Sequence, residues 1–323
     1  MLPFDLVEKL APSQHELEQY RQKLRAGQRK NRLIIVSLSL IFIALIAFAY
    51  RIQSPELAIC SIIGLCSPFI YASFCNNSPE TLYQNAYKQM INPVLLQHFS
   101  SELHYDPDHG LPSSDLAESK LFTGSIDRYS STDLVSGTYG KTKFRFSQVS
   151  AEELHKQTSS RGGSRTYYTI IFQGLLFIAD FNKNFSGHTY VRTDFAEKHL
   201  GNLGRFLQEH NLSSDEVVQL ENPEFEKAFA VYTNNQVEAR YILTPAMMDN
   251  LLDLRQRCIT ETQYSFHDSS ITVAIANSTL LFTPNFKCPA TNNEQLEAIY
   301  NQLDFFLSII NDLDLNTRIW SKE

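Results

Sequence analysis

The sequence predicts an α+β protein: an N-terminal transmembrane helical hairpin, followed by a mainly antiparallel sheet domain with flanking helices. Two observations lead to this prediction. Residues 33–50 and 57–74 are runs of 18 residues without a charged side chain, and the chain after them alternates short strand patterns, turn residues and amphipathic helices. The average over all 323 residues, 43% hydrophobic with a net charge of −7, hides this division. The composition excludes a collagen-like chain, a disulfide-stapled miniprotein and wholesale disorder.

The two apolar runs are the candidate membrane spans. A helix of 18 residues is about 27 Å long, which is close to the thickness of the hydrocarbon layer of a bilayer. The first run, Leu33–Tyr50, has two serines as its only polar side chains, and serine hydroxyls can bond their own helix backbone. The second run, Leu57–Phe74, contains Gly64 and Pro68, which membrane helices tolerate with a kink. A re-entrant or interfacial segment is the alternative for the second run.

Basic residues predict the orientation of the hairpin. Six Lys and Arg side chains crowd residues 21–32, whereas the connection between the spans, residues 51–56, offers only Arg51. The positive-inside rule therefore places the N-terminus, and everything after Phe74, in the cytoplasm. A membrane-impermeant thiol reagent is then expected to leave Cys258 and Cys288 unlabelled on intact cells. The five cysteines show no metal-binding spacing, and we expect them to be reduced.

The charge distribution bears on the partners of the chain. Residues 1–32 carry a net charge of +3, and residues 76–323 carry twenty basic against thirty acidic side chains. A domain this acidic is a poor nucleic-acid binder, so we expect no nucleic-acid partner. The expected partners are the lipid bilayer and either another protein or a second copy of the chain.

Two helices are expected next to the spans. Residues 1–32 are predicted to form a cytoplasmic N-terminal helix, opened by a capping box at Ser13 and Glu16, with an apolar stripe of Leu17, Tyr20 and Leu24. Residues 76–102 are predicted to hold a juxtamembrane helix from Ser78 to about Phe99. The two helices would emerge on one side of the membrane. They either pack together as a stalk or separately cover the soluble domain or the membrane surface.

Residues 103–323 are predicted to be the soluble α+β domain. A capped helix should begin at Thr244 and Pro245, and a flexible hairpin loop is expected over residues 159–164. Residues 150–154 have a helix-like pattern. The other expected helices cover residues 194–209 and 293–311, and strands are expected at residues 143–149, 167–172, 175–181, 189–191, 229–232, 240–243, 264–266, 271–276 and 280–282.

Three blocks of this domain carry a family resemblance. Residues 172–191, 220–232 and 237–245, in that order, resemble an uncharacterised bacterial family of two-span inner-membrane proteins with a cytoplasmic domain of unknown function. The resemblance covers roughly residues 30–315. It implies a multi-pass protein of the bacterial inner membrane with both termini in the cytoplasm. It supplies no activity, ligand or catalytic residue, so none is transferred.

Two local patterns resemble ligand sites and are better explained otherwise. Gly140-Lys141-Thr142 ends like a phosphate-binding loop, but Val135 stands where that motif requires glycine, and a strand pattern follows instead of a helix. His104 and His109 flank two aspartates, a set of ligand types that suits a divalent ion, yet residues so close on a proline-containing turn rarely converge on one metal. We therefore predict no cofactor and no metal.

Four charged residues lie inside the otherwise apolar blocks of the resemblance and are the candidate binding residues: Asp180, Lys183, Glu238 and Arg240. They could line a small polar pocket in which neighbouring charges shift one another's pKa. The interpretation that we favour is structural, as ion pairs at strand ends or residues on a hairpin face. Arg161 and Arg165, around two glycines, could hold an anion, although a charged hairpin tip is the simpler explanation.

These observations favour a membrane-anchored cytoplasmic module that binds a protein or a small ligand and is not an enzyme. The motifs of nucleotide-binding loops, zinc proteases and nucleophile elbows do not occur in the sequence. The competing hypothesis is a membrane-bound hydrolase or transferase that uses Asp180, Glu238 and Arg240. Transport through the hairpin itself has little support, because two charge-free spans offer no polar path.

Overall fold

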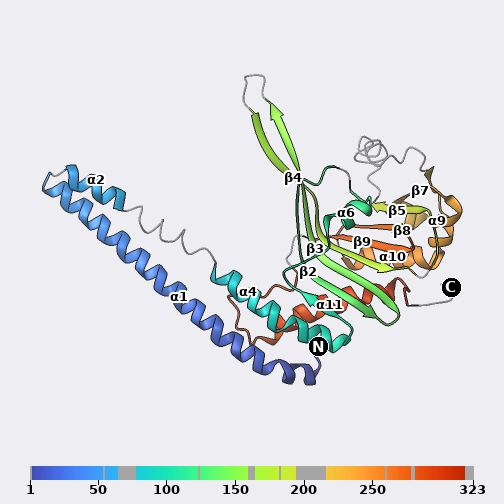
Figure 1. The fold of residues 1–323 in the computed structure, drawn as a ribbon, viewed down its shortest axis with the longest axis horizontal. Helices are drawn as coiled ribbons and strands as arrows, with labels where there is room; N and C mark the ends of the chain where they lie inside the picture. The colour runs from blue at the N-terminus through green and yellow to red at the C-terminus, as the bar shows by residue number, and fades with distance from the viewer. Residues whose placement is uncertain are drawn as a thin grey trace. The chain divides into compact units, whose positions relative to one another are not determined.

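The computed structural model describes residues 2–53, 55–64, 78–122, 124–158, 164–181, 183–193, 216–258, 260–277 and 281–316. The chain divides into two compact units, which are treated separately below: Met1–Asn92 with Thr283–Ala298, and Pro93–Phe282 with Ile299–Glu323. A long apolar N-terminal helix precedes an antiparallel sheet with flanking helices, so the predicted α+β class is confirmed (Figure 1).

The first unit is built on one helix, α1 (Phe4–Arg51), which runs without a break through 48 residues. The predicted separate helix that starts at Ser13 is therefore wrong. The helix begins at Phe4 and passes through Pro12, where the missing N–H removes only one backbone hydrogen bond. Burial of Leu6 and Leu10 in the first turns favours the longer helix.

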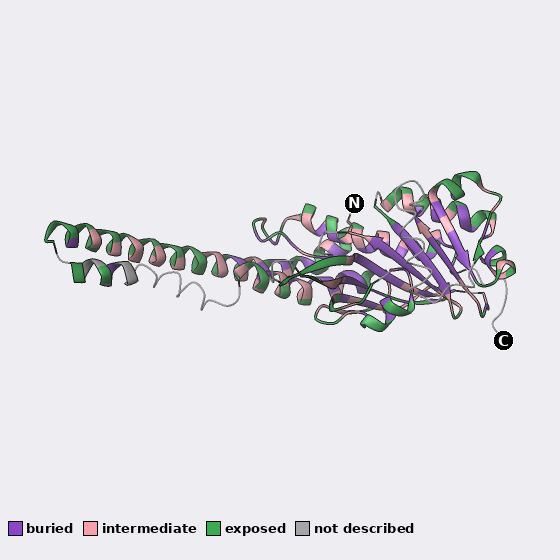
Figure 2. Cartoon of the chain, turned by 90° about the horizontal axis from the view of Figure 1, so that it is seen from above, coloured by how far each residue is buried: buried purple, intermediate pink, exposed green. Residues whose placement is uncertain are grey.

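The second half of α1 is the membrane-span candidate. Among the described residues, α1 is the one helix long and apolar enough to cross a bilayer, and only 6% of its most apolar 18-residue window is buried. Figure 2 shows this part of α1 as mostly exposed. A core helix of a soluble protein would be buried over such a window, so the exposure argues against a core helix.

The second predicted span is described only in part. Its first residues lie in α2 (Pro55–Gly64), which packs against α1, and residues 65–74 are outside the described residues. Gly64 allows this close approach, since a Cβ atom there would lie 2.1 Å from the Phe42 ring.

The predicted juxtamembrane helix is divided into two helices, α4 (Pro79–Met90) and α5 (Asn92–Phe99). The expected start is confirmed, because the Ser78 hydroxyl accepts a hydrogen bond from the Thr81 N–H at 3.2 Å. The break at Ile91 comes just before Pro93, which lacks an N–H and disfavours the helical conformation of the residue before it.

The second unit contains one antiparallel sheet of nine strands in the order β1-β2-β3-β4-β9-β8-β5-β7-β6. The strands are β1 (His104–Asp106), β2 (Arg128–Tyr139), β3 (Thr142–Thr158), β4 (Ser164–Asp180), β5 (His188–Thr193), β6 (Glu216–Val217), β7 (Phe229–Thr233), β8 (Thr262–His267) and β9 (Ser270–Ala276). The other helices are α6 (Ser113–Glu118), α8 (Pro223–Ala228), α9 (Gln236–Ile242), α10 (Pro245–Cys258) and α11 (Asn293–Asp312).

Both faces of the sheet are covered by buried side chains. On one face Phe146 packs against Phe177 and against Phe306 of α11, with ring centroids 6.1 and 5.4 Å apart. The other face buries a cluster around Val149 and Leu176 that includes Leu116 of α6. Figure 2 shows the central strands as largely buried, as expected for a sheet with both faces covered.

Several local predictions are wrong. Residues 150–154 are part of β3, and the two strands expected on either side of Gly174 are the single strand β4. The predicted strand at residues 240–243 lies mostly in α9, whose N-cap Asn235 accepts hydrogen bonds from the N–H groups of Val237 and Glu238. Residues 281–282 form a turn instead of a strand.

Other local predictions are confirmed. The cap at Thr244, the helix α10, the final helix α11 and the β8–β9 hairpin all form as expected. The helix expected at residues 194–209 and the loop tip at residues 159–163 lie outside the described residues.

Candidate functional site

Lys183 and Glu238 connect the segment after β4 to α9. The Lys183 Nζ donates a hydrogen bond to the Tyr241 carbonyl oxygen at 2.6 Å and lies 4.5 Å from the centroid of the Tyr241 ring. Burial lowers the pKa of Lys183. The Glu238 carboxylate accepts a hydrogen bond from the Gly187 N–H at 2.7 Å. Both side chains therefore hold the segment 183–187 against the helix.

Arg240 and Asp180 make other contacts. The Arg240 Nη1 donates to the Gln236 carbonyl oxygen and side-chain oxygen, one turn earlier on α9. Asp180 pairs with Ser270 across the β4–β9 ladder and lines an open pocket of about 240 Å³ together with Lys143 and Arg145. The Arg145 guanidinium is paired with Asp115 at 2.9 Å.

Replacing Glu238 with alanine is expected to lower the free energy of unfolding of the sheet domain by about 1 kcal/mol, because the Gly187 N–H loses a charged acceptor. Arg240→Ala is the matched control on the same helix, and an exposed side chain bonded within its own turn should change stability by less than about 0.5 kcal/mol. Thermal unfolding of the two variants measures the difference. Equal effects would refute the assignment of Glu238 as the residue that fixes segment 183–187.

The two patterns that resemble ligand sites have structural explanations. Gly140 and Lys141 form the turn between β2 and β3, with Gly140 at φ +65°, and β3 follows directly. His109 Nδ1 lies 2.8 Å from the Asp106 carboxylate, and that carboxylate also accepts hydrogen bonds from the N–H groups of Asp108 and His109. This is the geometry of an Asx turn at the end of β1.

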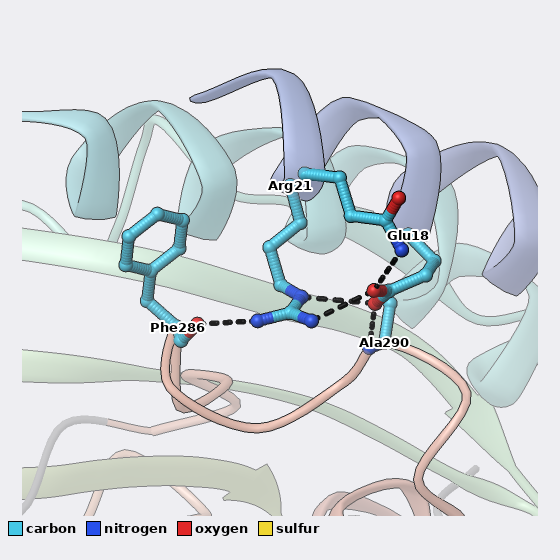
Figure 3. A network of polar contacts seen from close by, with 5 residues as sticks. Glu18, Arg21, Phe286 and Ala290 are labelled. Atoms are coloured by element: carbon cyan, nitrogen blue, oxygen red, sulfur yellow. Dashed lines mark hydrogen bonds and ion pairs between the residues drawn. The ribbon is translucent and has the colours of Figure 1, made fainter. Parts of the chain in front are cut away.

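The most extensive polar network of the first unit joins α1 to the segment before α11. We call it the helix clamp; it consists of Gln14, Glu18, Arg21, Phe286 and Ala290. Figure 3 shows the contacts among Glu18, Arg21, Phe286 and Ala290. The Glu18 carboxylate accepts two hydrogen bonds from the Arg21 guanidinium, at 2.7 and 2.9 Å. The Arg21 Nη1 donates to the Phe286 carbonyl oxygen at 3.2 Å.

Both backbone polar groups of Ala290 are hydrogen-bonded to side chains of α1. The Ala290 N–H donates to Glu18 at 2.8 Å, and the Ala290 carbonyl oxygen accepts from the Gln14 side-chain amide at 3.2 Å. Beside them, the Phe286 ring packs on the Tyr83 ring of α4 with centroids 5.5 Å apart. The clamp therefore fixes the backbone of the segment with side chains from α1, although that segment contains no regular structure.

Burial and charge make the clamp a strong interaction. The side chains of Arg21 and Glu18 are 5% and 14% exposed. The hydrogen bonds from Arg21 are the main reason why the pKa of Glu18 falls from 4.5 to about 2, and the same pairing raises the pKa of Arg21. A bidentate arginine–carboxylate pair that is this well shielded from solvent is stronger than a surface ion pair, and its geometry is more strictly defined.

The clamp was not predicted from the sequence. Arg21 was assigned only to the basic cluster that orients the membrane helix, and the predicted stripe of Leu17, Tyr20 and Leu24 is rotated from the true buried face. That face consists of Leu6, Leu10, Gln14, Leu17 and Arg21. The spacings between these residues, of four, four, three and four positions, are those of one helix face. This spacing could have shown that Gln14 and Arg21 lie on the same face as the three leucines.

The architecture defines a class of protein: a chain with an apolar N-terminal helix able to span a membrane and an antiparallel α+β domain. A family model described as "Protein of unknown function (DUF3137)" matches residues 170–315. The match extends from β4 through α11, so it covers most of the sheet domain and none of α1, which agrees with the expectation of an uncharacterised family.

The other comparisons add little. No curated protein matches the chain. The chain is similar to a solved structure described as the mycobacterial trehalose monomycolate transport factor A, TtfA, with 11% sequence identity and a TM-score of 0.32, over 68% of this chain and 91% of that chain. A TM-score this low supports no inference about fold or function.

Proposed function

We propose that this protein is a membrane-anchored binding module of the bacterial inner membrane, in which α1 and the segment that begins with α2 hold an acidic α+β domain at the cytoplasmic face. The observation that carries the proposal is the exposed apolar half of α1. An exposed apolar surface of this length is unfavourable in water and favourable in lipid.

The polar end of α1 supports the same arrangement. Exposed basic residues, among them Lys23, Arg29 and Lys30, lie between the clamp and the apolar half of the helix. Cations at this position favour the cytoplasmic side of the membrane and attract anionic headgroups. The clamp lies at the far end of the same helix, where it ties the anchor to the segment that continues into α11.

A binding role has more support than the alternative enzyme. Glu238 and Arg240, two of the three residues that a hydrolase or transferase would use, already bond the 186–187 backbone and the preceding turn of α9. These contacts favour a structural role for Glu238 and Arg240, which is to maintain the fold of the domain.

The anchor is tested by adding charge to the exposed apolar face of α1. We expect the full chain to stay with the membrane pellet after alkaline carbonate extraction, whereas the double variant Leu40→Lys/Ile43→Lys should be released to a larger extent, because only the segment that begins with α2 would still hold it. Each lysine at the centre of a span costs about 2.5 to 3.5 kcal/mol. Both positions are exposed, at 60% and 53%, so the folded units lose no packing. Gln28→Lys, an exposed position in the polar half, is the control that should remain in the pellet. Release of the unmodified chain would refute the anchor.

The side of the membrane is tested by thiol labelling on spheroplasts. Cys258 is a poor probe, because burial raises the pKa of its thiol to about 12 and leaves little reactive thiolate at neutral pH. An exposed residue of α8 serves better, and a Lys227→Cys variant should react with an impermeant maleimide only after lysis. Labelling of intact spheroplasts would place the sheet domain outside the cytoplasm.

A further inference from the structure

The outer parts of β3 and β4 form a two-stranded arm, which we define as residues 152–158 and 164–170. Figure 1 shows the arm projecting from the sheet. The ladder between β2 and β3 ends at the pair Arg128 and Glu152, and the ladder between β4 and β9 begins at Gly174. Within the described residues, the two strands of the arm are thus paired only with each other beyond Glu152.

A projecting ribbon of this kind needs stabilisation, since an isolated two-stranded hairpin is marginally stable in water. The arm also exposes large apolar side chains: Tyr167, Tyr168 and Ile170 are 45%, 43% and 57% exposed. Tyr168 and Ile170 lie on one face, because residues paired across an antiparallel ladder point to the same side, and Tyr167 lies on the other face, where its ring stacks on His155. Successive pairs on this face are Glu152 with Ile170, Leu154 with Tyr168, and Lys156 with Thr166.

This face is held in one conformation within a single chain. The Arg128 guanidinium stacks on the Tyr168 ring at 3.8 Å from its centroid and also bonds the Glu152 carboxylate at 3.0 Å. Asp127 accepts a hydrogen bond from the Leu154 N–H at 2.8 Å, and this bond lowers the pKa of Asp127. A pre-ordered apolar face loses less side-chain entropy when it binds.

We propose that this arm face is a self-association surface that packs against the same face of a second copy of the chain, with the two arms antiparallel. The charges on the two faces are complementary in this arrangement. Leu154 and Tyr168 form the middle pair of the face. On β3, Glu152 lies two residues before Leu154, nearer the base of the arm, and Lys156 lies two residues after it. A two-fold axis through the middle pair places Glu152 of each chain opposite Lys156 of the other.

The overall charge of the arm agrees with this arrangement. The described strands of the arm carry Lys156 and Arg165 and no acidic residue beyond Glu153, whereas at the base Asp127, Glu152 and Glu153 outnumber Arg128. Antiparallel arms bring each basic tip toward an acidic base, and parallel arms would bring like charges together. An anionic membrane is a poorer match, because the exposed apolar side chains lie within the two described strands and residues 159–164, which follow in the sequence, are polar.

Confinement to a bilayer would strengthen such a contact. The face is small, so the interface belongs to the weak or transient class. Anchoring both copies in one membrane raises their effective concentration without any new contact. Self-association requires only the arm, so the two proposals can be tested separately. The arm can fail to associate in a chain that is anchored in the membrane, and it can associate in a chain that is not anchored.

The proposal is tested with the full chain reconstituted in lipid vesicles at a low protein-to-lipid ratio. Facing sheets lie about 10 Å apart, so a bis-maleimide with a spacer of that length should join two Leu154→Cys chains in which the five native cysteines are replaced by serine. Gln157→Cys, on the opposite face of the same arm, is the matched control and reports random collisions. We expect at least about a tenfold higher yield of joined chains from Leu154→Cys, which corresponds to about 1.4 kcal/mol.

Charge exchange then tests the register. In the Leu154→Cys background, Glu152→Lys alone should reduce the yield to the control level, and so should Lys156→Glu alone. The double exchange should restore it, because each lysine again faces a glutamate of the other copy. Glu152→Lys also faces Arg128 within its own chain, a repulsion that the second substitution does not remove, so restoration reports contact between chains. Thr169→Lys, exposed on the opposite face, should have no effect.

Two results would overturn the proposal. One is a yield from Leu154→Cys that does not exceed the yield from Gln157→Cys. The other is a double exchange that fails to restore cross-linking while circular dichroism shows that the variant is folded.

Discussion

Replacing Arg21 with methionine is expected to destabilise the first unit by about 3 kcal/mol or more, the range seen when one partner of a buried ion pair is removed. Methionine fills much of the same volume, so the loss is electrostatic. Glu18, whose side chain is 14% exposed, would keep its charge without the guanidinium, and the Phe286 carbonyl oxygen would lose its donor.

Amide hydrogen exchange over residues 284–290 measures this loss directly, because the Ala290 N–H is bonded to Glu18. Arg29→Met is the matched control. Arg29 is an exposed cation two turns further along α1, and its removal should leave exchange at Ala290 unchanged. If Arg21→Met and Arg29→Met give the same exchange rates, the clamp does not hold the segment.

The pH dependence gives a second measure of the same pair. The pKa of Glu18 is about 2 in the folded unit against 4.5 for the free carboxyl, so the carboxylate stabilises the folded state above pH 4.5. That stabilisation is lost progressively as the pH falls from 4.5 toward 2. Other carboxyl groups titrate in the same range, so the informative quantity is the difference in exchange between the unmodified chain and Arg21→Met, which should shrink over this interval.

The clamp illustrates why the sequence predicted part of the first unit and missed the rest. The apolar half of α1 was predictable, because a charge-free run of 18 residues has few alternatives to a helix in lipid. The continuation of the helix to Phe4 was missed, since a proline with a capping pattern beside it is a common helix start. The backbone groups that Glu18 and Arg21 bind, at Ala290 and Phe286, are more than 260 residues away, and no local pattern contains such a contact.

The sheet domain shows the same limit. Strand patterns located β8 and β9 and parts of β3 and β4, because alternation of apolar residues is a local property. Residues 240–243 were assigned wrongly, since Tyr241, Ile242 and Leu243 suit a strand as well as a short helix, and the cap at Asn235 decides between them. Among the candidate binding residues, the charges of Lys183 and Glu238 were visible, but their partners are a carbonyl oxygen and an N–H group, which any residue can provide.

Gly174 is the position where the local sequence pattern was most misleading. Gln173 and Gly174 between two apolar runs suggested an interruption, yet β4 continues through them and pairs with β9 from Gly174 onward. Only glycine fits at position 174, because the backbone of residues 275–277 lies too close for a side chain. A Cβ atom would lie 2.1 Å from the Ile275 carbonyl oxygen and 2.8 Å from the Asn277 nitrogen. These are backbone atoms of the neighbouring chain segment, so no side-chain rotation can relieve the contact.

Gly174→Ala is therefore expected to lower the free energy of unfolding of the sheet domain by about 3 kcal/mol or more, because β4 and β9 must separate at their first pair. The same substitution at Gly27 is the control. Gly27 lies in the interior of α1 with no atom within 4 Å of its added Cβ, so alanine should favour the helix by about 0.5 to 1 kcal/mol. Denaturant unfolding of the sheet domain, followed by the circular dichroism of its strands, should show a large decrease for Gly174→Ala and none for Gly27→Ala. A Gly174→Ala chain as stable as the unmodified one would mean that β4 and β9 do not approach this closely.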